Sequence, residues 1–211
     1  MTPSKPKRPY DAPARKDRAR RNRLAVIDAA ERGFLRDGYG PTTVAAIAGD
    51  AGVSPDMIYK TFGGKPGLVR AIRERALEGA GSVPAERRSD ALHEGEQTAR
   101  DIIDAWGVLT AEVAPRVAPI LLLIRSAAAT DPDVLQLLEE MDADRLRRMT
   151  QNARRLHEAG RLRAGVSVAQ AADVLWTYSA PELYELLVLR RGWPARRYGR
   201  FIADAMMEAL L

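Results

Sequence analysis

A run of side chains suited to contacting phosphates and base edges extends through residues 43–65. Hydroxyl, phenol and ammonium groups suit phosphate oxygens, lysine can donate to guanine acceptors, and aspartate can accept from cytosine. The residues concerned are Thr43, Ser54, Pro55, Asp56, Met57, Tyr59, Lys60, Thr61 and Lys65. Most of these side-chain types are able to contact nucleic acid.

The elements that must position these side chains begin with a short helix predicted at residues 43–50. Thr43 can cap its start, because a hydroxyl accepts from backbone amides that are unpaired there. Val44, Ile47 and Ala48 recur at helical spacing and form one buried stripe. Gly52 then supplies a turn, where a positive φ carries no steric penalty, and Val53 turns inward to pack between the helices.

A second short helix is predicted at residues 54–61. Ser54 caps it, and Pro55 fits its first position, where no amide hydrogen is needed. Ile58 and Phe62 continue the buried stripe, so most of the remaining side chains face outward. A glycine pair ends this helix, and a third helix starts at Lys65. Two short helices joined by a tight turn are the layout of a helix-turn-helix, which places its second helix in the DNA major groove.

Two residues of the second helix have alternative interpretations. Asp56 either accepts from a base or only favours the helix N-terminus electrostatically. Met57 either packs in the core or contacts a thymine methyl group. The spacing alone leaves both alternatives open.

The segment resembles the DNA-binding domain of TetR/AcrR-family transcriptional regulators. The matching positions run in register over about 45 residues. They are Val26 to Ala30, Phe34, Leu35, Gly38, Tyr39, Thr43, Val44, Ile47, Ala48, Ala51 to Ser54, Ile58, Tyr59, Phe62, Lys65 and Leu68. Many members of the family carry histidine immediately before the phenylalanine, where this chain has Thr61. A hydroxyl still reaches a phosphate, but a contact capable of carrying charge is lost.

The resemblance implies a division of roles among the exposed residues. Tyr59 and Lys65 match positions that commonly touch the DNA backbone, and Thr43 can do the same from another helix start. The candidates for reading bases are Ser54, Pro55, Asp56, Met57 and Lys60.

The distribution of charge agrees with binding to DNA. The chain has 211 residues and a net charge of +5, but residues 1–85 hold 16 Lys and Arg against 9 Asp and Glu. Residues 86–211 hold 17 Arg against 19 Asp and Glu, so the positive excess lies with the helix-turn-helix. Residues 1–16, rich in proline and basic side chains, are predicted to be a disordered arm that either follows the DNA or is only a solubilising tail.

Other classes of function find little support. Without cysteine, neither a disulfide nor a thiolate metal site can form, and His93 and His157 lack metal-ligand spacing. No nucleophile elbow or phosphate loop is present, so we expect no enzyme, no metal and no cofactor. The longest apolar run, residues 117–124, is shorter than a membrane span, and no signal peptide is visible, so we expect a cytoplasmic protein without membrane contact.

The remainder of the chain predicts an all-α fold of about nine helices. No stretch alternates with period two between hairpin turns. The expected helices cover residues 17–37, 43–50, 54–61, 65–79, 88–112, 115–129, 131–159, 168–191 and 194–210. Glycine, serine and proline at residues 79–85 indicate a boundary between a helix-turn-helix domain, 17–80, and a C-terminal helical domain, 86–211.

The end of the chain carries a second, weaker resemblance to TetR-family effector domains, in residues 171–176, 181–184 and 191–193. In that family the last two helices pair with their symmetry mates. The resemblance therefore implies a homodimer with an interface that includes Leu183, Leu186, Leu187, Phe201, Ile202 and Met206. It also implies a cavity for a small-molecule effector, with Trp106, Arg125, Trp176, Tyr178 and Tyr184 as candidate lining residues. For each of these five, a place in the core or at an interface is the alternative; Arg125, after an apolar run, either pairs an acidic ligand group or a nearby aspartate.

Together these features predict a sequence-specific regulator that binds a palindromic operator as a homodimer. The resemblance suggests a repressor released by a ligand. The alternative is an architectural protein that binds DNA with a steep salt dependence but little preference for sequence.

Overall fold

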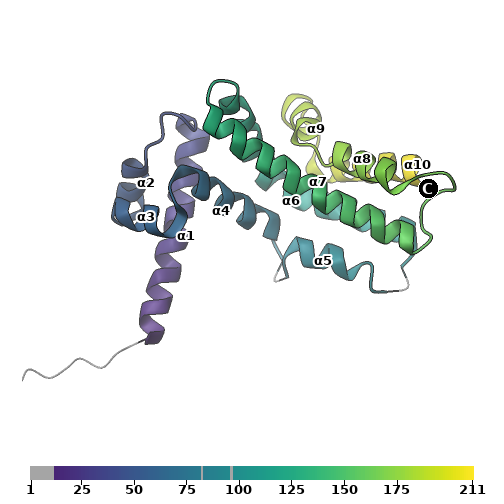
Figure 1. The fold of residues 1–211 in the computed structure, drawn as a ribbon, viewed down its shortest axis with the longest axis horizontal. Helices are drawn as coiled ribbons and strands as arrows, with labels where there is room; N and C mark the ends of the chain where they lie inside the picture. The colour runs from purple at the N-terminus through teal and green to yellow at the C-terminus, as the bar shows by residue number, and fades with distance from the viewer. Residues whose placement is uncertain (1–11, 82, 96) are drawn as a thin grey trace, which may run out of the picture.

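A computed structural model describes residues 12–81, 83–95 and 97–211 of the chain, and α-helices dominate it. No strand occurs within these ranges, and the all-α prediction is confirmed. Figure 1 shows an elongated molecule with the helix-turn-helix at one end and the C-terminus near the other. Residues 1–11 of the predicted arm lie outside the described residues.

The N-terminal domain consists of four helices around an apolar core. They are α1 (Ala12–Asp37), α2 (Val44–Ala51), α3 (Pro55–Phe62) and α4 (Lys65–Glu78). Phe34, Ile58 and Leu68 are fully buried at its centre. Helix α1 begins at Ala12, five residues before the start predicted at residue 17, so residues 12–16 of the predicted arm are helical.

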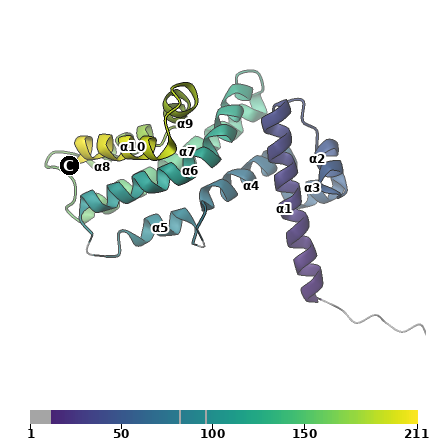
Figure 2. The same ribbon diagram turned by 180° about the vertical axis from the view of Figure 1, so that it is seen from behind.

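The C-terminal domain is built on two long helices. These are α6 (Ala99–Ala128) and α7 (Pro132–Glu158), which lie between α4 and the short α5 (Ala85–Ala91) on one side and α8 (Val168–Tyr178) and α10 (Ala195–Leu210) on the other. Figure 2 shows the same three layers from behind. Between α8 and α10, α9 (Pro181–Tyr184) continues into a π-helical segment, Glu185–Arg190.

The predicted break of a helix at Pro115 is wrong. Helix α6 runs through Pro115 and Pro119 without interruption. A proline inside a helix removes a backbone hydrogen bond, but apolar side chains on both sides of the prolines, such as Ile103 and Ile124, are fully buried and hold the axis in place.

The predicted start of that helix at residue 88 is also wrong. The start of α6 is fixed by a capping box, in which Thr98 accepts from the Asp101 amide and Asp101 accepts from the Thr98 amide. Similarly, the helix predicted over 168–191 ends at Tyr178 and restarts at Pro181, because a proline is favoured at the first turn of a new helix. Both signals are local and visible in the sequence.

Helix α6 has a length and composition that would also suit a membrane span. It is the only such helix among the described residues. Its faces contact α10, α7, α4 and α9, which places it at the centre of the C-terminal domain. They bury 28% of its most apolar window, so contacts with other helices account for part of its apolar composition.

The two domains share packing as well as a linker. Apolar residues near the C-terminal end of α6 and the N-terminal end of α7, such as Ile124 and Leu137, belong to the same core cluster as the helix-turn-helix. Glu112 of α6 contacts Ala80, just after α4, and Arg88 of α5. The Glu112 carboxylate accepts from the Ala80 amide at 2.6 Å and from both terminal nitrogens of Arg88 at 2.9 and 2.5 Å.

These contacts predict a pH dependence of stability. The hydrogen bonds from Arg88 and the Ala80 amide lower the pKa of Glu112 from about 4.5 to about 2. A lowered pKa in the folded state stabilises the protein above the unfolded pKa, and the contribution is lost as pH falls from about 4.5 to about 2. We expect the melting temperature of Glu112→Gln to fall less steeply over this range than that of the wild type. The exposed α7 variant Glu139→Gln is the control, and equal slopes for the two variants would contradict the prediction.

Candidate nucleic-acid interface and core cavity

The geometry of the α2–turn–α3 unit follows the predicted caps. Thr43 accepts from the Ala46 amide at 3.1 Å, and Ser54 accepts from the Met57 amide at 3.3 Å. Gly52 ends α2 in the left-handed region with φ of 66°. Each capping hydroxyl uses an oxygen lone pair, so its own proton stays available for a phosphate.

The predicted contact residues of α3 share one exposed surface. Ile58 faces the core and is fully buried, whereas Tyr59 is 57% exposed. Residues Ser54, Pro55, Asp56, Lys60 and Thr61 are exposed as well. Met57 is half-buried against the N-terminal core, and its sulfur lies 3.5 Å from the Thr61 hydroxyl oxygen. We therefore assign Met57 partly to packing, while Asp56 remains on the outer surface in the first turn of α3.

Lys65 has a structural contact that the sequence did not predict. Its ammonium donates to the carbonyl oxygens of Tyr39 at 2.6 Å and Gly40 at 3.2 Å, and lies 4.2 Å from the centre of the Tyr39 ring. Burial lowers the pKa of Lys65. Because an ammonium has three N–H donors, one remains beyond these two bonds. Lys65 thus ties the start of α4 to the turn after α1.

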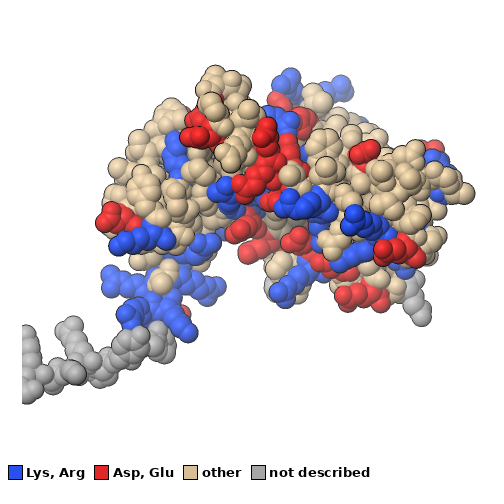
Figure 3. Space-filling view, in the orientation of Figure 1, with Lys and Arg blue, Asp and Glu red and all other residues tan. Residues whose placement is uncertain are grey.

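Basic side chains also line the first half of α1. Figure 3 shows Lys and Arg gathered around the end of α1 that projects beyond α2 and α3, whereas charges of both signs mix over the C-terminal domain. The exposed cations described on this part of α1 are Arg15, Lys16, Arg18, Arg20, Arg21 and Arg23. Arg23 also lies 4.9 Å from the centre of the Phe62 ring at the end of α3. The structure therefore presents these cations on a helix that is continuous with the domain.

Helix α4 connects the interface to the C-terminal domain through ion pairs. Arg75 pairs with Asp28 and Glu31 of α1. On the side facing α7, Arg70 pairs with Glu140 at 2.5 Å and Arg73 with Asp144 at 3.3 Å. A displacement of α4 relative to α7 would therefore change the position of the helix-turn-helix.

A cavity of about 780 Å³ lies within the C-terminal domain, next to α4. Its walls come from α4 to α10 and are mostly apolar, with side chains such as Leu77, Val113 and Met149. Of the five predicted lining residues, Trp106 and Tyr184 contribute to the wall, and Arg125, Trp176 and Tyr178 do not. Trp106 donates from its indole nitrogen to the Ser89 hydroxyl at 2.9 Å.

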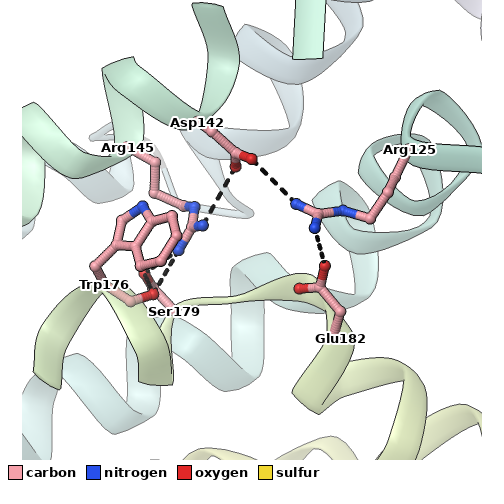
Figure 4. Close-up of polar contacts among 6 residues, drawn as sticks. All are labelled: Arg125, Asp142, Arg145, Trp176, Ser179 and Glu182. Atoms are coloured by element: carbon pink, nitrogen blue, oxygen red, sulfur yellow. Dashed lines mark hydrogen bonds and ion pairs between the residues drawn. The ribbon is translucent and has the colours of Figure 1, made fainter. Parts of the chain in front are cut away.

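The two predicted residues Arg125 and Trp176 belong instead to a polar network beside the cavity, shown in Figure 4. Arg125 pairs with Asp142 at 3.1 Å and with Glu182 at 2.5 Å. Arg125 is therefore paired with two carboxylates of the protein itself, so it needs no acidic ligand group as a partner. The indole ring of Trp176 lies 4.5 Å from the guanidinium carbon of Arg145.

Arg145 and Asn152 are polar cavity residues that the sequence analysis missed. Arg145 lines the cavity and pairs with Asp142 at 3.2 Å, while donating to the Trp176 carbonyl and to the Ser179 hydroxyl at 3.1 Å. Burial lowers the pKa of Arg145. Asn152 is buried at the wall, and its side-chain oxygen makes no hydrogen bond. Their spacing of seven residues on α7, which places both on one helical face, was the available signal.

The predicted dimer-interface residues divide into two groups. Leu186 and Phe201 are exposed, with Leu183 and Leu187 half-buried beside them. The prediction that Ile202 and Met206 lie at the dimer interface is wrong. Both are buried in the core of the C-terminal domain, at 0% and 4% exposure. On the outer face of α10 the exposed aromatic residue is Phe201. Its ring packs edge-on against the ring of Trp193, with 5.6 Å between the two ring centres.

The sequence of the helix-turn-helix matches a known family. Residues 26–72 match the family of bacterial regulatory proteins called the tetR family. Over 63 residues the chain is 44% identical to the transcriptional regulator TtgR of Pseudomonas putida, a match that covers 30% of each protein. Over 149 residues it is 26% identical to the regulator YvkB of Bacillus subtilis, covering 71% of this chain and 74% of YvkB.

Solved structures share the fold over most of the chain. The complex of FadR from Bacillus subtilis with stearoyl-CoA superimposes with a TM-score of 0.69 at 17% identity, covering 90% of this chain and 100% of FadR. The complex of SmeT with triclosan gives a TM-score of 0.68 at 23% identity, covering 90% and 91%. SmeT represses a multidrug efflux pump of Stenotrophomonas maltophilia. At these identities the likeness concerns the fold of both domains.

Proposed function

We propose, starting from the premise that this chain is a transcriptional regulator of the TetR family, that it is a repressor released from a palindromic operator by a small molecule. The observation that carries the DNA-binding part is the exposed surface of α3, with Tyr59 and Lys60 outside and Ile58 inside. A helix presented in this way fits the major groove. Ser54, Pro55, Asp56 and Lys60 are the proposed base readers, with a partial contribution from Met57.

Phosphate contacts would surround this surface. Thr43, Tyr59 and Thr61 offer hydroxyl groups, and Lys65 offers its third N–H donor. The basic half of α1 extends the positive surface and favours binding to DNA of any sequence. Specificity would then come from α3, and much of the affinity from these cations.

Release by a ligand would act through α4. Arg73, Glu74 and Leu77 of α4 line the cavity, and the same helix begins at Lys65 next to α3. A ligand that favours one position of α4 shifts the separation of the two recognition helices, by no more than its difference in affinity for the two states. The Arg73–Asp144 ion pair, whose partners both line the cavity, is the contact most directly exposed to such a ligand.

A homodimer is required by this function, because two recognition helices about 34 Å apart read the two halves of a palindrome. The proposed interface uses Leu183, Leu186 and Leu187 with Phe201, and Leu189 adds to it at 55% exposure. Exposed apolar side chains gathered on one face mark such interfaces. We also infer a cytoplasmic, non-enzymatic role, in keeping with relatives named as transcriptional regulators.

This interface makes a specific prediction. The double substitution Leu186→Asp and Leu189→Asp places charges at the proposed contact, and we expect a monomer by light scattering coupled to size-exclusion chromatography. Operator affinity should fall at least about a hundredfold, because the second half-site is no longer bound by a linked partner. The control is Leu35→Asp on α1, where the leucine is similarly exposed at 47%. A double variant that remains dimeric would contradict the assignment.

The experiment that tests the main proposal is selection from a randomised DNA duplex library with the purified protein. We expect enrichment of a palindrome, with an affinity about 10³ or more above that for random DNA. If no sequence is enriched and affinity follows only the salt concentration, the protein is an architectural DNA-binding protein, which is the second candidate. The observation that favours this second candidate is the basic first half of α1, which attracts DNA of any sequence.

A further inference from the structure

The charges around the cavity balance. The lining includes five cationic side chains, which are Arg73, Arg87, Arg145, Arg147 and Arg148. It also includes five acidic side chains, which are Glu74, Glu78, Glu86, Asp142 and Asp144. The formal net charge of the wall is therefore zero. A balanced wall gives no overall electrostatic preference for either an anionic or a cationic ligand.

Each of the less exposed guanidinium groups in the wall already has a carboxylate partner. Arg145, with a side chain only 12% exposed, pairs with Asp142. The Arg148 side chain is 18% exposed and pairs with Asp90 at 2.9 Å. Arg73, also 18% exposed, pairs with Asp144.

An anionic ligand that pairs with one of these three guanidinium groups would therefore have to displace a carboxylate of the protein. Arg87 lies at an exposed position of the lining, where water screens its attraction for an anion. Displacing Asp142 would also disturb Arg125, which shares that carboxylate (Figure 4). The displaced carboxylate would be left without one of its partners, and this cost opposes binding. The acidic residues Glu74 and Glu78 lie at exposed positions on α4, where water screens their attraction for a cation.

Asn152 is a polar residue of the wall whose side-chain oxygen lacks a partner. It is only 4% exposed, and its side-chain oxygen is buried without a hydrogen bond. A buried polar group in this condition favours a ligand that completes its hydrogen bonding. Its amide carries both an acceptor and donors, so a hydroxyl or an amide group of a ligand is the matching chemistry.

The rest of the wall sets the shape of the ligand. Arg145 and Asn152 are separated by seven residues on α7, or about 10 Å along the helix axis. Met149 lies between them, and Leu109, Val113 and Val117 of α6 contribute further apolar wall. A ligand placed here would bury an apolar body over most of its length.

We propose that the effector is an uncharged, mostly apolar molecule with one hydroxyl or amide group that hydrogen bonds to Asn152. This inference rests on the proposed function in taking the cavity to be the effector site. It goes further in naming the class of ligand and the residue that recognises its polar group. Carboxylates, phosphate esters and aliphatic amines of similar size, which carry a charge at neutral pH, are disfavoured.

The test uses two fluorescent probes that differ by one charged group. Phenylnaphthylamine is uncharged and has one N–H donor, and anilinonaphthalene sulfonate has the same aromatic framework with an added sulfonate. Both gain fluorescence on leaving water, so both can be titrated directly into the protein. We expect phenylnaphthylamine to bind at one site per chain, at least about tenfold more tightly than the sulfonate, because a buried sulfonate would meet only guanidinium groups that are already paired with carboxylates. Equal or tighter binding of the sulfonate, or no binding of the uncharged probe, would overturn the proposal.

Substitution of Asn152 locates the site. Asn152→Leu removes the polar group at nearly constant volume, and we expect about five- to tenfold weaker binding of phenylnaphthylamine, as for the loss of one neutral hydrogen bond. The melting temperature should be maintained or raised, because a buried atom without a partner is removed. Gln151→Leu, at the exposed neighbouring position on α7, is the matched control and should leave binding unchanged. Unchanged binding in Asn152→Leu would contradict the assigned contact.

The probe titration is made without DNA, so its result does not depend on whether the protein is a repressor. If the uncharged probe binds through Asn152 but does not weaken operator binding at saturation, the ligand class stands and release by that ligand is refuted. If a charged compound releases the operator and competes with the probe, the repressor function stands and the ligand class is refuted.

Discussion

Substitution of Gly199 by alanine is expected to lower the free energy of unfolding by about 3 kcal/mol, at the upper end of the usual range for overpacking. A Cβ atom at Gly199 would lie 2.2 Å from the Gly107 carbonyl oxygen and 2.8 Å from the Ala111 Cβ. The first of these neighbours is backbone, so it cannot move aside as a flexible side chain would. Helices α10 and α6 would have to separate along their contact.

Helix propensity alone predicts the opposite sign. Alanine is favoured over glycine inside a helix by about 1 kcal/mol. The control Gly49→Ala on α2, where a Cβ meets nothing within 4 Å, should show this gain. Chemical denaturation of the two variants and the wild type measures both effects. A Gly199→Ala protein as stable as the wild type would show that the two helices do not approach as closely as described.

The same substitution should affect assembly. Phe201 lies two residues after Gly199 on α10 and belongs to the proposed dimer surface. Displacement of α10 would move Phe201 relative to Leu186 and Leu187. We therefore expect weaker dimerisation in Gly199→Ala even at temperatures where the chain remains folded.

The largest expected effect on function follows from Lys60→Ala. A good contact between a side chain and a base contributes about 1–3 kcal/mol of discrimination. Because the proposed homodimer would lose the contact in both half-sites, the total is about 2–6 kcal/mol, or roughly a 30-fold to 10⁴-fold loss of operator affinity. Lys60 is exposed on α3, so its removal should leave the fold intact.

The control for Lys60→Ala is Arg196→Ala, which removes an exposed positive charge on α10, away from α3. Affinities for the selected operator and for a scrambled duplex, measured at several salt concentrations, separate base reading from phosphate contact. We expect Lys60→Ala to weaken operator binding more than binding to the scrambled duplex. Equal losses on both would assign Lys60 to the DNA backbone.

The helix-turn-helix could be predicted closely because its determinants are local. The caps at Thr43 and Ser54 and the left-handed Gly52 each depend on residues within a few positions along the chain. The outward side of α3 follows from the buried Ile58 by helical periodicity alone. The two missed boundaries, at Thr98 and Pro181, also had local signals, so closer attention to caps would have found them.

The cavity could not be predicted in the same way. Trp106 and Tyr184 line it, whereas Trp176 packs on Arg145 beside it, and residue type does not distinguish these positions. Similarly, Ile202 and Phe201 are adjacent in sequence, yet only Phe201 reaches the surface. Which apolar side of a helix faces the core depends on the helices packed against it.

The sequence by itself therefore determined the all-α class, the helix-turn-helix and the side of α3 that faces outward, because short-range hydrogen bonding and helical periodicity encode them. Only the tertiary structure decided that α6 continues through Pro115, that Asp142 pairs both Arg125 and Arg145, and that Asn152 is left unpaired in the wall. These features depend on contacts between helices far apart in the chain. Their energies come from burial and pairing that no single segment contains.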